Sequence, residues 1–421
     1  MAKQTNEGFQ GDLIVGLDLG TSKTCCLIAE TDAEDGLHLI GVGNVPSIGL
    51  KKGAVINIEA TVDSMRKALG EAQRMAGVEV RSAFFGVGGE HIRGMTSHGV
   101  IAVGRKDKEV TEDDVERVLE AAKAIAIPQD REIIHVLTQE YMIDNQDGIR
   151  EPVGMSGVRL EAKVHVITGA VTSVQNILKS ADRAGLGVDD LILQPLASAA
   201  AVLTADEKEL GVALVDIGGG TTDLVVMMEG AVRHTGVVPV GGAQFTRDLA
   251  IGLRTPNEDA EDIKRKYGCV RADLLVDGDE IPVAGVGGRA QRSMPRRSVA
   301  EILQPRAEEL LGLVAAELKK SGFEGKLAAG YVLTGGSSQI AGLRELAEDM
   351  LGAQVSLGKP QALQGLGDVV QAPEYATAVG LLLEGKRLRS QGGGTRVTKA
   401  EPAQPGGGVA NKVKNFFKEY F

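Results

Sequence analysis

The sequence predicts an α/β fold in which one structural unit occurs twice. Two apolar stretches of similar design, LIVGLDLGTSK (13–23) and GVALVDIGGGTTDLVVM (211–227), each indicate a buried strand, an aspartate, a glycine-rich turn and a second strand. A third apolar run, AAGYVLTGGSSQI (328–340), also ends in a glycine turn. Segments of helical periodicity separate these strands, which is typical of the α/β class.

The composition is that of a soluble globular body of two to four structural units. The 421 residues are 43% apolar and 24% charged, and the formal charge of −11 argues against a general nucleic-acid binder. Three cysteines cannot form a disulfide framework and fit a reducing compartment. The first residues lack a basic and apolar signal segment, and no run reaches the 18 apolar residues of a membrane span. We therefore expect a cytoplasmic body.

Three helices are predicted between the strands. TVDSMRKALGEAQRMAG (61–77) has apolar residues at helical spacing, a threonine as its expected N-cap and Gly77 as its end. TEDDVERVLEAAKAI (111–125) begins with a threonine cap followed by three acids, which the helix dipole favours. Residues 298–322 form a long amphipathic stretch. From about residue 388 glycine and proline replace the periodicity, so residues 388–408 are predicted to be a flexible linker.

The glycine turns have the chemistry of a site for a nucleotide and Mg²⁺. Glycine lets backbone N–H groups approach phosphate oxygens, and carboxylates can orient the waters of a Mg²⁺ that keeps its hydration shell. Asp18 and Asp216 are the predicted carboxylates, acting on Mg²⁺ through its waters. Plain turns would explain any single Asp-x-Gly, but two such loops and a third glycine turn favour a clamp around one nucleotide. The predicted nucleotide-binding residues of the three glycine turns are Gly20, Thr21, Ser22, Lys23, Gly218, Gly219, Gly220, Thr221, Thr222, Gly335, Gly336 and Ser337.

These loops resemble the phosphate and adenosine loops of the actin, Hsp70 and sugar-kinase superfamily. QPLASAAAVL (194–203) and YATAVGLLL (375–383) resemble its two connecting helices, and EDAEDIKRKYG (258–268) its helix that contacts ribose and adenine. The resemblance implies ATP and Mg²⁺ as ligands, with Gly242, Glu261 and Lys264 as further contacts. It also implies that Asp18, Asp216 and Gln194 are the catalytic set, with Gln194 positioning the attacking water. Many relatives have Glu there, so we expect slow ATP hydrolysis at most.

A narrower resemblance is to the bacterial cell-division family FtsA. It rests on SAFFGVGGEHIRGMTSHGVIAV (82–103), REIIHVLTQEYMIDNQDGI (131–149), EPVGMSGVRLEAKVHVITG (151–169) and GLGDVVQAPEYATAVGLLLEG (365–385). It covers about residues 12–388 and the terminal helix, and it implies a two-lobed, actin-like ATPase fold with ribonuclease-H-like duplicated domains, an inserted subdomain and a C-terminal amphipathic helix. The implied units are 1A (12–86, 168–200 and 374–387), the inserted 1C (87–167), 2A (201–244 and 325–373) and 2B (245–324).

The last residues, GVANKVKNFFKEYF (408–421), predict an amphipathic helix over 409–421. At 100° per residue, the apolar side chains occupy one arc of roughly 140° and the polar ones fill the remainder. Four of the chain's thirteen aromatic residues lie in the last six positions. Such a helix suits a membrane interface with anionic lipid, although docking on the folded body or on a partner is an alternative. The predicted membrane contacts are Val413, Phe416, Phe417, Tyr420, Phe421, Lys412, Lys414 and Lys418.

The family resemblance implies a scaffold at the division site. It would be a peripheral protein on the cytoplasmic face of the inner membrane that self-associates and anchors filaments of the tubulin-like protein FtsZ. Residues 245–324 would receive the FtsZ C-terminal tail peptide, with Arg296 and Arg297 as candidate contacts, although a solvated surface explains these arginines equally well. The inserted subdomain would receive other division proteins, and no nucleic acid is expected.

Three other classes remain possible at this point. A pilus-assembly actin homologue of the PilM type is similar in the inserted subdomain, but the phenylalanine-rich tail favours division. A sugar or acetate-type kinase would need a further buried carboxylate as general base, and the sequence offers no obvious candidate. An Hsp70-like chaperone would need a large peptide-binding domain, and only about 35 residues follow the ATPase unit.

Overall fold

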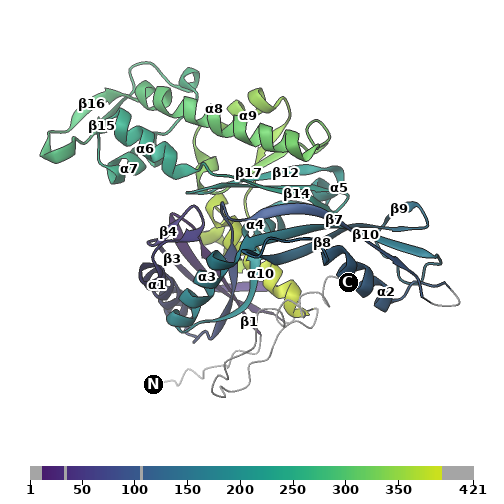
Figure 1. Cartoon of the computed structure of the whole chain (residues 1–421). Helices are drawn as coiled ribbons and strands as arrows, with labels where there is room; N and C mark the ends of the chain where they lie inside the picture. Colours follow the sequence, from purple (N-terminus) through teal and green to yellow (C-terminus); the bar gives the residue numbers. More distant parts are fainter. Residues whose placement is uncertain (1–11, 33–35, 105–107, 391–421) are drawn as a thin grey trace, which may run out of the picture.

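The chain folds into two lobes with a third body projecting from the first lobe (Figure 1). This computed structural model describes residues 12–32, 36–104 and 108–390. The predicted α/β architecture with an inserted subdomain is confirmed. The predicted terminal helix (409–421) and all but the first three residues of the predicted linker lie outside the described residues.

The first lobe is built on a six-stranded sheet in the order β11-β6-β1-β2-β3-β19. Strand β1 pairs antiparallel with β2 and parallel with β6, and buried aliphatic side chains cover both faces of this sheet. Its strands are β1 (Leu13–Leu19), β2 (Lys23–Thr31), β3 (Leu37–Pro46), β6 (Ser82–Val87), β11 (Gly187–Leu193) and β19 (Gln364–Gly365), with the small hairpin β4 (Leu50–Lys51) and β5 (Ala54–Val55) beside them. Helices α1 (Ile58–Ala76) and α3 (Val171–Ala184) belong to the same lobe.

The second lobe repeats this design. Its five-stranded sheet has the order β14-β13-β12-β17-β18, and β12 again pairs antiparallel with the next strand and parallel with β17. Strand for strand, β12, β13, β14, β17 and β18 therefore correspond to β1, β2, β3, β6 and β11. The bounds are β12 (Val212–Ile217), β13 (Thr222–Met228), β14 (Ala231–Val238), β17 (Tyr331–Thr334) and β18 (Val355–Leu357). The duplication predicted from the aspartate hairpins is confirmed.

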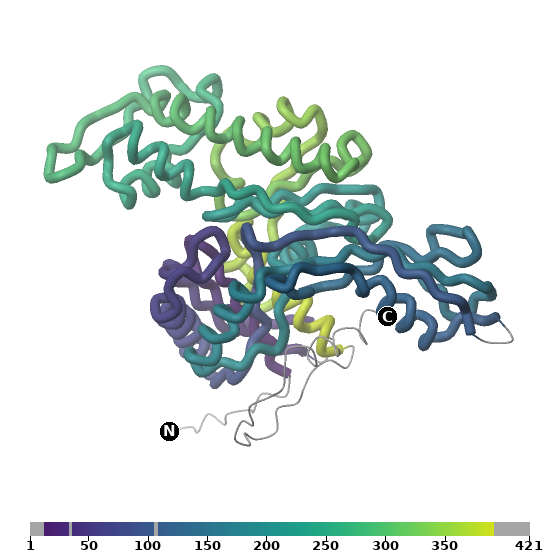
Figure 2. The backbone as a smooth tube through the Cα atoms, in the orientation of Figure 1, coloured from purple at the N-terminus to yellow at the C-terminus, as the bar shows by residue number. Residues whose placement is uncertain are grey.

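Two smaller bodies project to opposite sides of the molecule (Figure 2). The inserted subdomain is a four-stranded sheet, β7-β10-β8-β9, packed against one helix around its own apolar core. Its elements are β7 (Arg93–Ala102), α2 (Glu112–Lys123), β8 (Arg131–Ile143), β9 (Gln146–Ile149) and β10 (Arg159–Ala170). The second body belongs to the second lobe and contains α6 (Gly242–Gly252), α7 (Asn257–Tyr267), β15 (Glu280–Val283), β16 (Arg292–Pro295) and α8 (Arg296–Ser321), with α9 (Leu343–Leu351) beside it.

Two helices connect the lobes, as the sequence predicted. They are α4 (Gln194–Val202), which is followed by the short α5 (Ala205–Leu210), and α10 (Ala376–Leu388). Helices α4 and α10 cross closely because Gly380 has no side chain: a Cβ there would lie 1.8 Å from the carbonyl oxygen of Ala197. This crossing brings the start of α4 and the start of α10 to the space between the lobes.

One predicted helix start is wrong. Helix α1 begins at Ile58, three residues before the expected threonine cap, and Asn57 caps it by accepting a hydrogen bond from the N–H of Ala60 at 3.1 Å. Thr61 is fully buried inside the helix, where its hydroxyl donates to the carbonyl of Asn57. Asparagine is at least as good an N-cap as threonine, so cap preference alone does not favour Thr61 over Asn57. The predicted end at Gly77 and the Thr111 cap of α2 are confirmed.

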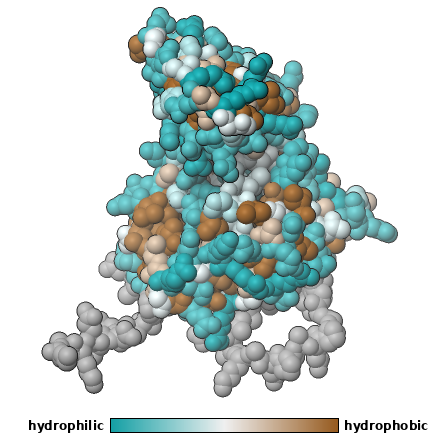
Figure 3. Space-filling view, turned by 90° about the vertical axis from the view of Figure 1, so that its left-hand side faces the viewer, coloured by the Kyte–Doolittle hydropathy of each residue, from teal (hydrophilic) through white to brown (hydrophobic). Residues whose placement is uncertain are grey.

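The side of the molecule that carries α1 and β4 narrows between the two lobes, and apolar side chains gather on its lower lobe (Figure 3). Among the exposed apolar residues of the first lobe are Ile48 and Ile56, on either side of the β4–β5 hairpin, with 59% and 67% of their surface accessible. Exposed apolar side chains that gather on one face are a common feature of protein association sites.

Candidate functional site

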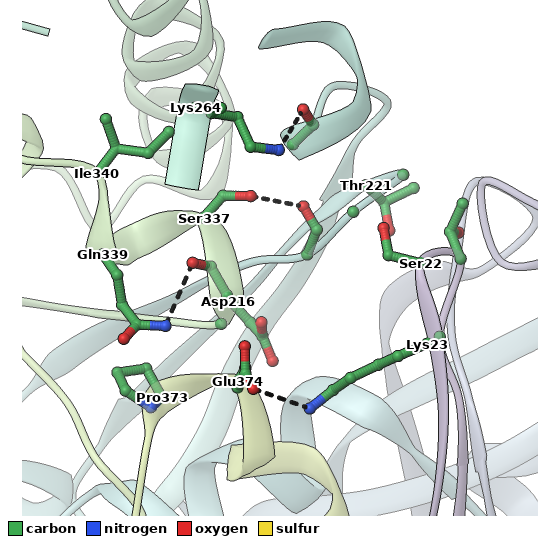
Figure 4. A pocket seen from close by; sticks show the side chains of 18 of the residues that line it. Ser22, Lys23, Asp216, Thr221, Lys264, Ser337, Gln339, Ile340, Pro373 and Glu374 are labelled. Carbon is green, nitrogen blue, oxygen red and sulfur yellow. Dashed lines mark hydrogen bonds and ion pairs between the residues drawn. The ribbon is translucent and has the colours of Figure 1, made fainter. Parts of the chain in front are cut away.

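A cavity of about 480 Å³ lies between the lobes. The turn between β1 and β2, the turn between β12 and β13, and the turn after β17 all line it, together with the first residues of α4, α6 and α10. Figure 4 shows side chains from these elements pointing into one space. Of the predicted site residues, the cavity lining includes Asp18, Gly20, Thr21, Ser22, Lys23, Gln194, Asp216, Gly218, Gly219, Gly220, Thr221, Gly242, Glu261, Lys264, Gly335, Gly336 and Ser337.

Helix α4 holds the two predicted aspartates in place. The Gln194 side-chain amide donates to Asp18 Oδ1 at 2.8 Å, and the Ser198 hydroxyl donates to Asp216 Oδ2 at 2.6 Å. Gln194 and Ser198 are four residues apart, so they lie on one face of the helix. Thr377, at the start of α10, also donates to Asp216 Oδ2, at 3.4 Å. The connecting helices therefore position a carboxylate from each lobe, a role of Ser198 and Thr377 that sequence reasoning missed.

A third buried carboxylate, Asp223, faces the same cavity. Its Oδ2 accepts from Thr221 at 3.2 Å, while its Oδ1 is buried with no hydrogen-bond partner among the described residues. Thr222, between them, is turned to the opposite face of β13 and donates to the carbonyl of Val240 at 2.8 Å. The structure therefore places the side chain of Thr222, a predicted site residue, outside the cavity. Side chains alternate along a strand, so Thr221 and Asp223 line the cavity instead.

Burial shifts the pKa values of all three carboxyl groups upward. Loss of solvation raises the pKa of Asp18 to about 6, although the charge of Lys23 and the hydrogen bond from Gln194 act in the opposite direction. Burial and the neighbouring Asp216 raise the pKa of Asp223 to about 7, and burial also raises the pKa of Asp216. The raised pKa values mean that the ionised forms of these three groups are not fully stabilised by the protein. A bound cation would neutralise their negative charge.

Lys23 supplies a cation at the floor of the cavity. Its Nζ lies 3.9 Å from Glu374 Oε1 and 3.7 Å from the centre of the Tyr375 ring, and it has no hydrogen-bond partner among the described residues (Figure 4). Glu374 and Tyr375 lie just before α10 and were not predicted as site residues. An ammonium held by these contacts alone keeps its three donors for another acceptor.

The turn between β1 and β2 and the turn between β12 and β13 contact each other across the space between the lobes. A Cβ on Gly219 would lie 1.9 Å from Ser22 Oγ, and a Cβ on Gly220 would lie 2.5 Å from Thr21 Oγ1. Only glycine permits this approach of the two backbones. The pair of turns therefore forms a continuous wall of backbone amides and hydroxyls.

The opposite end of the cavity is formed by the second lobe. Lys264 Nζ lies 2.6 Å from Glu261 Oε2 and donates to the carbonyl of Gly242 at 3.1 Å. Burial disfavours the charge of Lys264 and lowers its pKa. Burial alone would raise the pKa of Glu261, but the ion pair and hydrogen bonds with Lys264 lower it. Gly335, with φ 83°, brings its backbone so close that a Cβ would lie 2.3 Å from Asp216 Oδ1.

This arrangement could hold a polyphosphate with a divalent cation. Amides, hydroxyls and one lysine line one side, and three carboxylates face them, with an orphaned carboxylate oxygen on Asp223. Among the described residues no group of three or more His, Cys, Asp or Glu side chains could hold a metal ion directly. The donor set therefore fits a hydrated Mg²⁺ whose remaining ligands are waters and phosphate oxygens.

Arg296 and Arg297 start helix α8 and do not share one environment. Arg296 lines the cavity, donates to the carbonyl of Tyr267 at 3.0 Å and pairs with Asp279 at 3.2 Å. Arg297 is outside the cavity lining and is about half exposed, with Asp277 and Glu301 each 3.6 Å away. All eight predicted membrane contacts, from Lys412 to Phe421, lie outside the described residues.

Comparison with known proteins decides the family. Residues 213–380 match the family model described as "Cell division protein FtsA", and residues 89–168 match "SHS2 domain inserted in FTSA". The chain is 53% identical to cell division protein FtsA of Pseudomonas aeruginosa over 98% of this chain and 99% of that protein, and 46% identical to that of Neisseria meningitidis over 96% and 98%. The Escherichia coli K12 protein is 43% identical over 90% and 92%.

The chain belongs to the FtsA family of cell division proteins. The resemblance drawn from the sequence is thereby confirmed. The match of 89–168 coincides with the body that projects from the first lobe, which is thus the SHS2 insertion of FtsA proteins.

Solved structures with the same fold agree with this at the level of architecture. The PilM–PilN type IV pilus biogenesis complex has a TM-score of 0.65 and 19% identity over 89% of this chain and 98% of that one. MreB 5 of Spiroplasma citri bound to AMPPNP has a TM-score of 0.53 and 13% identity over 90% and 97%. At these identities the likeness shows the fold alone. Membership of the FtsA family favours a cell-division protein over a pilus-assembly protein or a kinase. The sequence argument against a kinase, that no further buried carboxylate was available, does not hold, because Asp223 is such a carboxylate.

Proposed function

We propose that this FtsA-family protein binds MgATP between its lobes, attaches to the cytoplasmic face of the inner membrane through residues 409–421, and anchors FtsZ filaments there. In this proposal it also self-associates in the division ring, and the inserted subdomain receives other division proteins. The observation that supports it most is the pair of corresponding hairpins, one from each repeated sheet, whose aspartates Asp18 and Asp216 line one cavity.

In this proposal the turns bind the phosphates and Lys264 and Glu261 bind the adenosine end. The amides of Gly20 to Ser22 and Gly218 to Thr221 would contact phosphate oxygens, and Asp18, Asp216 and Asp223 would orient the waters of Mg²⁺. The ion supplies charge neutralisation of the phosphates. Gln194, which donates a hydrogen bond to Asp18, can orient a water, but its neutral amide cannot accept a proton from that water. We therefore expect hydrolysis to be slow.

The affinity for MgATP is expected to decrease as the pH is lowered. A carboxyl group with a raised pKa favours the folded apo protein while protonated; this contribution is complete below its unfolded pKa near 3.8 and is lost as pH rises through about 6 for Asp18 and about 7 for Asp223. Mg²⁺ requires the ionised forms, so both protons must leave on binding. Between about pH 7.5 and about pH 5.5 the affinity should therefore fall roughly 100-fold.

Isothermal titration with MgATP at both pH values measures this effect. Asp223→Asn removes one titrating group, so the variant should retain only the roughly fourfold change that belongs to Asp18. The comparison with this variant also cancels the protonation of ATP itself. An affinity with the same pH dependence in the parent chain and in Asp223→Asn would contradict the assignment of Asp223 to the cation site.

For the membrane we propose a peripheral attachment. Within the described ranges, every helix is too short or too polar to cross a bilayer. The residues proposed to contact lipid are the apolar and lysine side chains of 412–421, with aromatic rings at headgroup depth and lysines toward anionic lipid. Exposed Ile48 and Ile56 are candidate contacts for self-association.

For FtsZ we propose that the body around α8 receives its acidic tail peptide through Arg296 and Arg297. The double reversal Arg296→Glu with Arg297→Glu should weaken peptide binding at least about tenfold, because like charges then replace attraction. Fluorescence anisotropy of a labelled tail peptide measures this. Lys320→Glu, near the far end of α8 and exposed, is the matched control and should bind normally. Because Arg296 also lines the cavity, Arg297→Glu alone should show part of the loss. Unchanged affinity in both arginine variants would contradict the proposal.

The function as a whole is tested by imaging in dividing cells. The fluorescently labelled full chain should form a band at mid-cell that coincides with FtsZ. A chain ending at Gly408 should lose the band or leave it diffuse. A full-length protein that is spread evenly while FtsZ rings form would contradict the proposed anchoring role.

A further inference from the structure

A buried histidine of the inserted subdomain contacts the start of the connecting helix α4. The backbone N–H of Leu193 donates to His135 Nε2 at 3.0 Å, and His135 is only 2% exposed. Leu193 is the N-cap residue of α4, and no side chain within the helix caps this end. The first N–H groups of a helix have no partner inside the helix. His135 thus supplies from another subdomain an acceptor that α4 lacks.

The imidazole is in the form that this bond requires. Burial, together with the charge of Arg387, lowers the pKa of His135 to about 3, so the ring is neutral at physiological pH. A neutral imidazole accepts at one nitrogen only. Because Nε2 is the acceptor for Leu193, the ring proton is on Nδ1.

The strand that carries His135 is shaped around this contact. The pairing of β8 with β10 skips Ile134, which precedes His135, and skips Gln139. Such irregularities redirect individual side chains out of a regular sheet. Gln139 uses its position to donate to the carbonyls of Val232 and Arg233 on β14, at 2.9 and 3.0 Å. Strand β8 is therefore tied both to the connecting helix and to the second lobe.

The residue that follows Leu193 is Gln194, whose side chain has little freedom. Its amide donates to Asp18, and its Oε1 is so close to the end of β6 that a Cβ on Gly88 would lie 2.1 Å from it. A side chain packed this tightly follows its backbone, so a shift in the first turn of α4 moves Gln194 relative to Asp18. The backbone at that turn is held by His135.

We propose that His135 is a positioning residue for Gln194, so that the inserted subdomain determines how a water is held at the phosphate end of the cavity. This inference rests on the proposed function. It implies that a partner which displaces the inserted subdomain changes the water geometry at a site in the cleft, without contacting the nucleotide.

The test compares two probes, MgADP with aluminium fluoride and MgADP alone. Aluminium fluoride completes a transition-state mimic that includes the attacking water, so the ratio of the two affinities reports water positioning. His135→Leu removes the acceptor while keeping apolar volume and should weaken the aluminium fluoride complex about tenfold (about 1.4 kcal/mol). Its MgADP affinity should stay within about twofold of the parent.

Three further variants separate positioning from general damage. His135→Gln places an amide oxygen near the position of Nε2 and should restore most of the ratio. Ser97→Ala removes a buried hydrogen bond to Ala122 in the same subdomain, far from α4 in the sequence, and should leave the ratio unchanged. In a Gln194→Ala background His135→Leu should have no additional effect, because the two residues act as one unit. If His135→Leu does not fold, His135→Asn, too short to reach Leu193, carries the same expectation.

Each outcome decides a separate point. Equal weakening of both probes by His135→Leu, or losses that add to those of Gln194→Ala, would overturn the inference. A parent chain that binds MgADP but gains nothing from aluminium fluoride would also overturn it, while leaving nucleotide binding intact. A parent chain that binds neither MgADP nor MgATP would instead refute the proposed function. Hydrogen exchange at the Leu193 amide is an independent check: His135→Leu should speed it and His135→Gln should not.

Discussion

The variant Asp18→Ala is expected to bind MgATP on the order of 100-fold more weakly than the parent chain. The carboxylate would accept hydrogen bonds from waters of the cation, and a hydrogen bond to a charged group contributes up to about 3 kcal/mol. Asp18 lies within hydrogen-bond distance of Gln194 and shares its cavity with Asp216 and Asp223. Removing it leaves the ion with charge from one lobe only. Isothermal titration at a pH above 7.5, where the group is ionised, measures the loss.

Two controls accompany this measurement. Asp63→Ala removes an exposed aspartate of α1 that pairs with Lys67, and its MgATP affinity should equal that of the parent. Asp216→Ala should cost about as much as Asp18→Ala, since the two residues hold corresponding places in the repeated sheets. Undiminished MgATP binding by Asp18→Ala would show that the hairpin of β1 and β2 does not hold the cation.

A chain that ends at Gly408 is expected to lose nearly all binding to vesicles that contain anionic lipid. Three lysines contribute about 1 kcal/mol each near an anionic surface, and the apolar face adds several more. Loss of the lysine contribution alone corresponds to more than about 100-fold in affinity. Co-sedimentation with vesicles measures the bound fraction. Replacing Lys412, Lys414 and Lys418 by Gln should remove the salt-dependent part and leave the apolar part.

The same experiment has a second readout. One such helix binds reversibly, but many copies in a polymer bind together, so the bound fraction should rise steeply once the protein self-associates. MgATP should shift that rise to lower protein concentration if the nucleotide favours assembly. Sedimentation of the truncated chain at the level of the full chain would refute the attachment through residues 409–421.

Much of the fold and most of the site could be predicted from the sequence, because their signals are local. The strand–aspartate–glycine pattern occurs twice, and each copy forms the same antiparallel hairpin. Glycine turns next to buried strands predicted thirteen of the residues that line one cavity. Gln194, Gly242, Glu261 and Lys264 were assigned through the family resemblance, and periodicity alone would not have found them.

The remainder depends on contacts between distant segments. Ser198 and Thr377 hold Asp216 only because two helices nearly 180 residues apart cross at Gly380. Thr222 and Asp223 are neighbours in the polar run that follows the glycine turn, and only the alternation of side chains from the start of β13 at Thr222 decides which of them faces the cavity. A lone histidine such as His135 is usually structural, and its partner, a backbone N–H on another subdomain, leaves no trace in the sequence. For Asp223, the alternation of side chains along β13 was the sequence signal that could have placed it in the cavity.

The measurement that tests the central claim most directly is hydrogen–deuterium exchange of the full chain during a titration with MgATP. If the hairpins at Asp18 and Asp216 grip the same nucleotide, amides of residues 18–23 and 216–223 should gain protection together, with one common dissociation constant. Asp18→Ala should shift both protection curves by the same factor. Protection of only one hairpin, or of the two at different MgATP concentrations, would contradict the account.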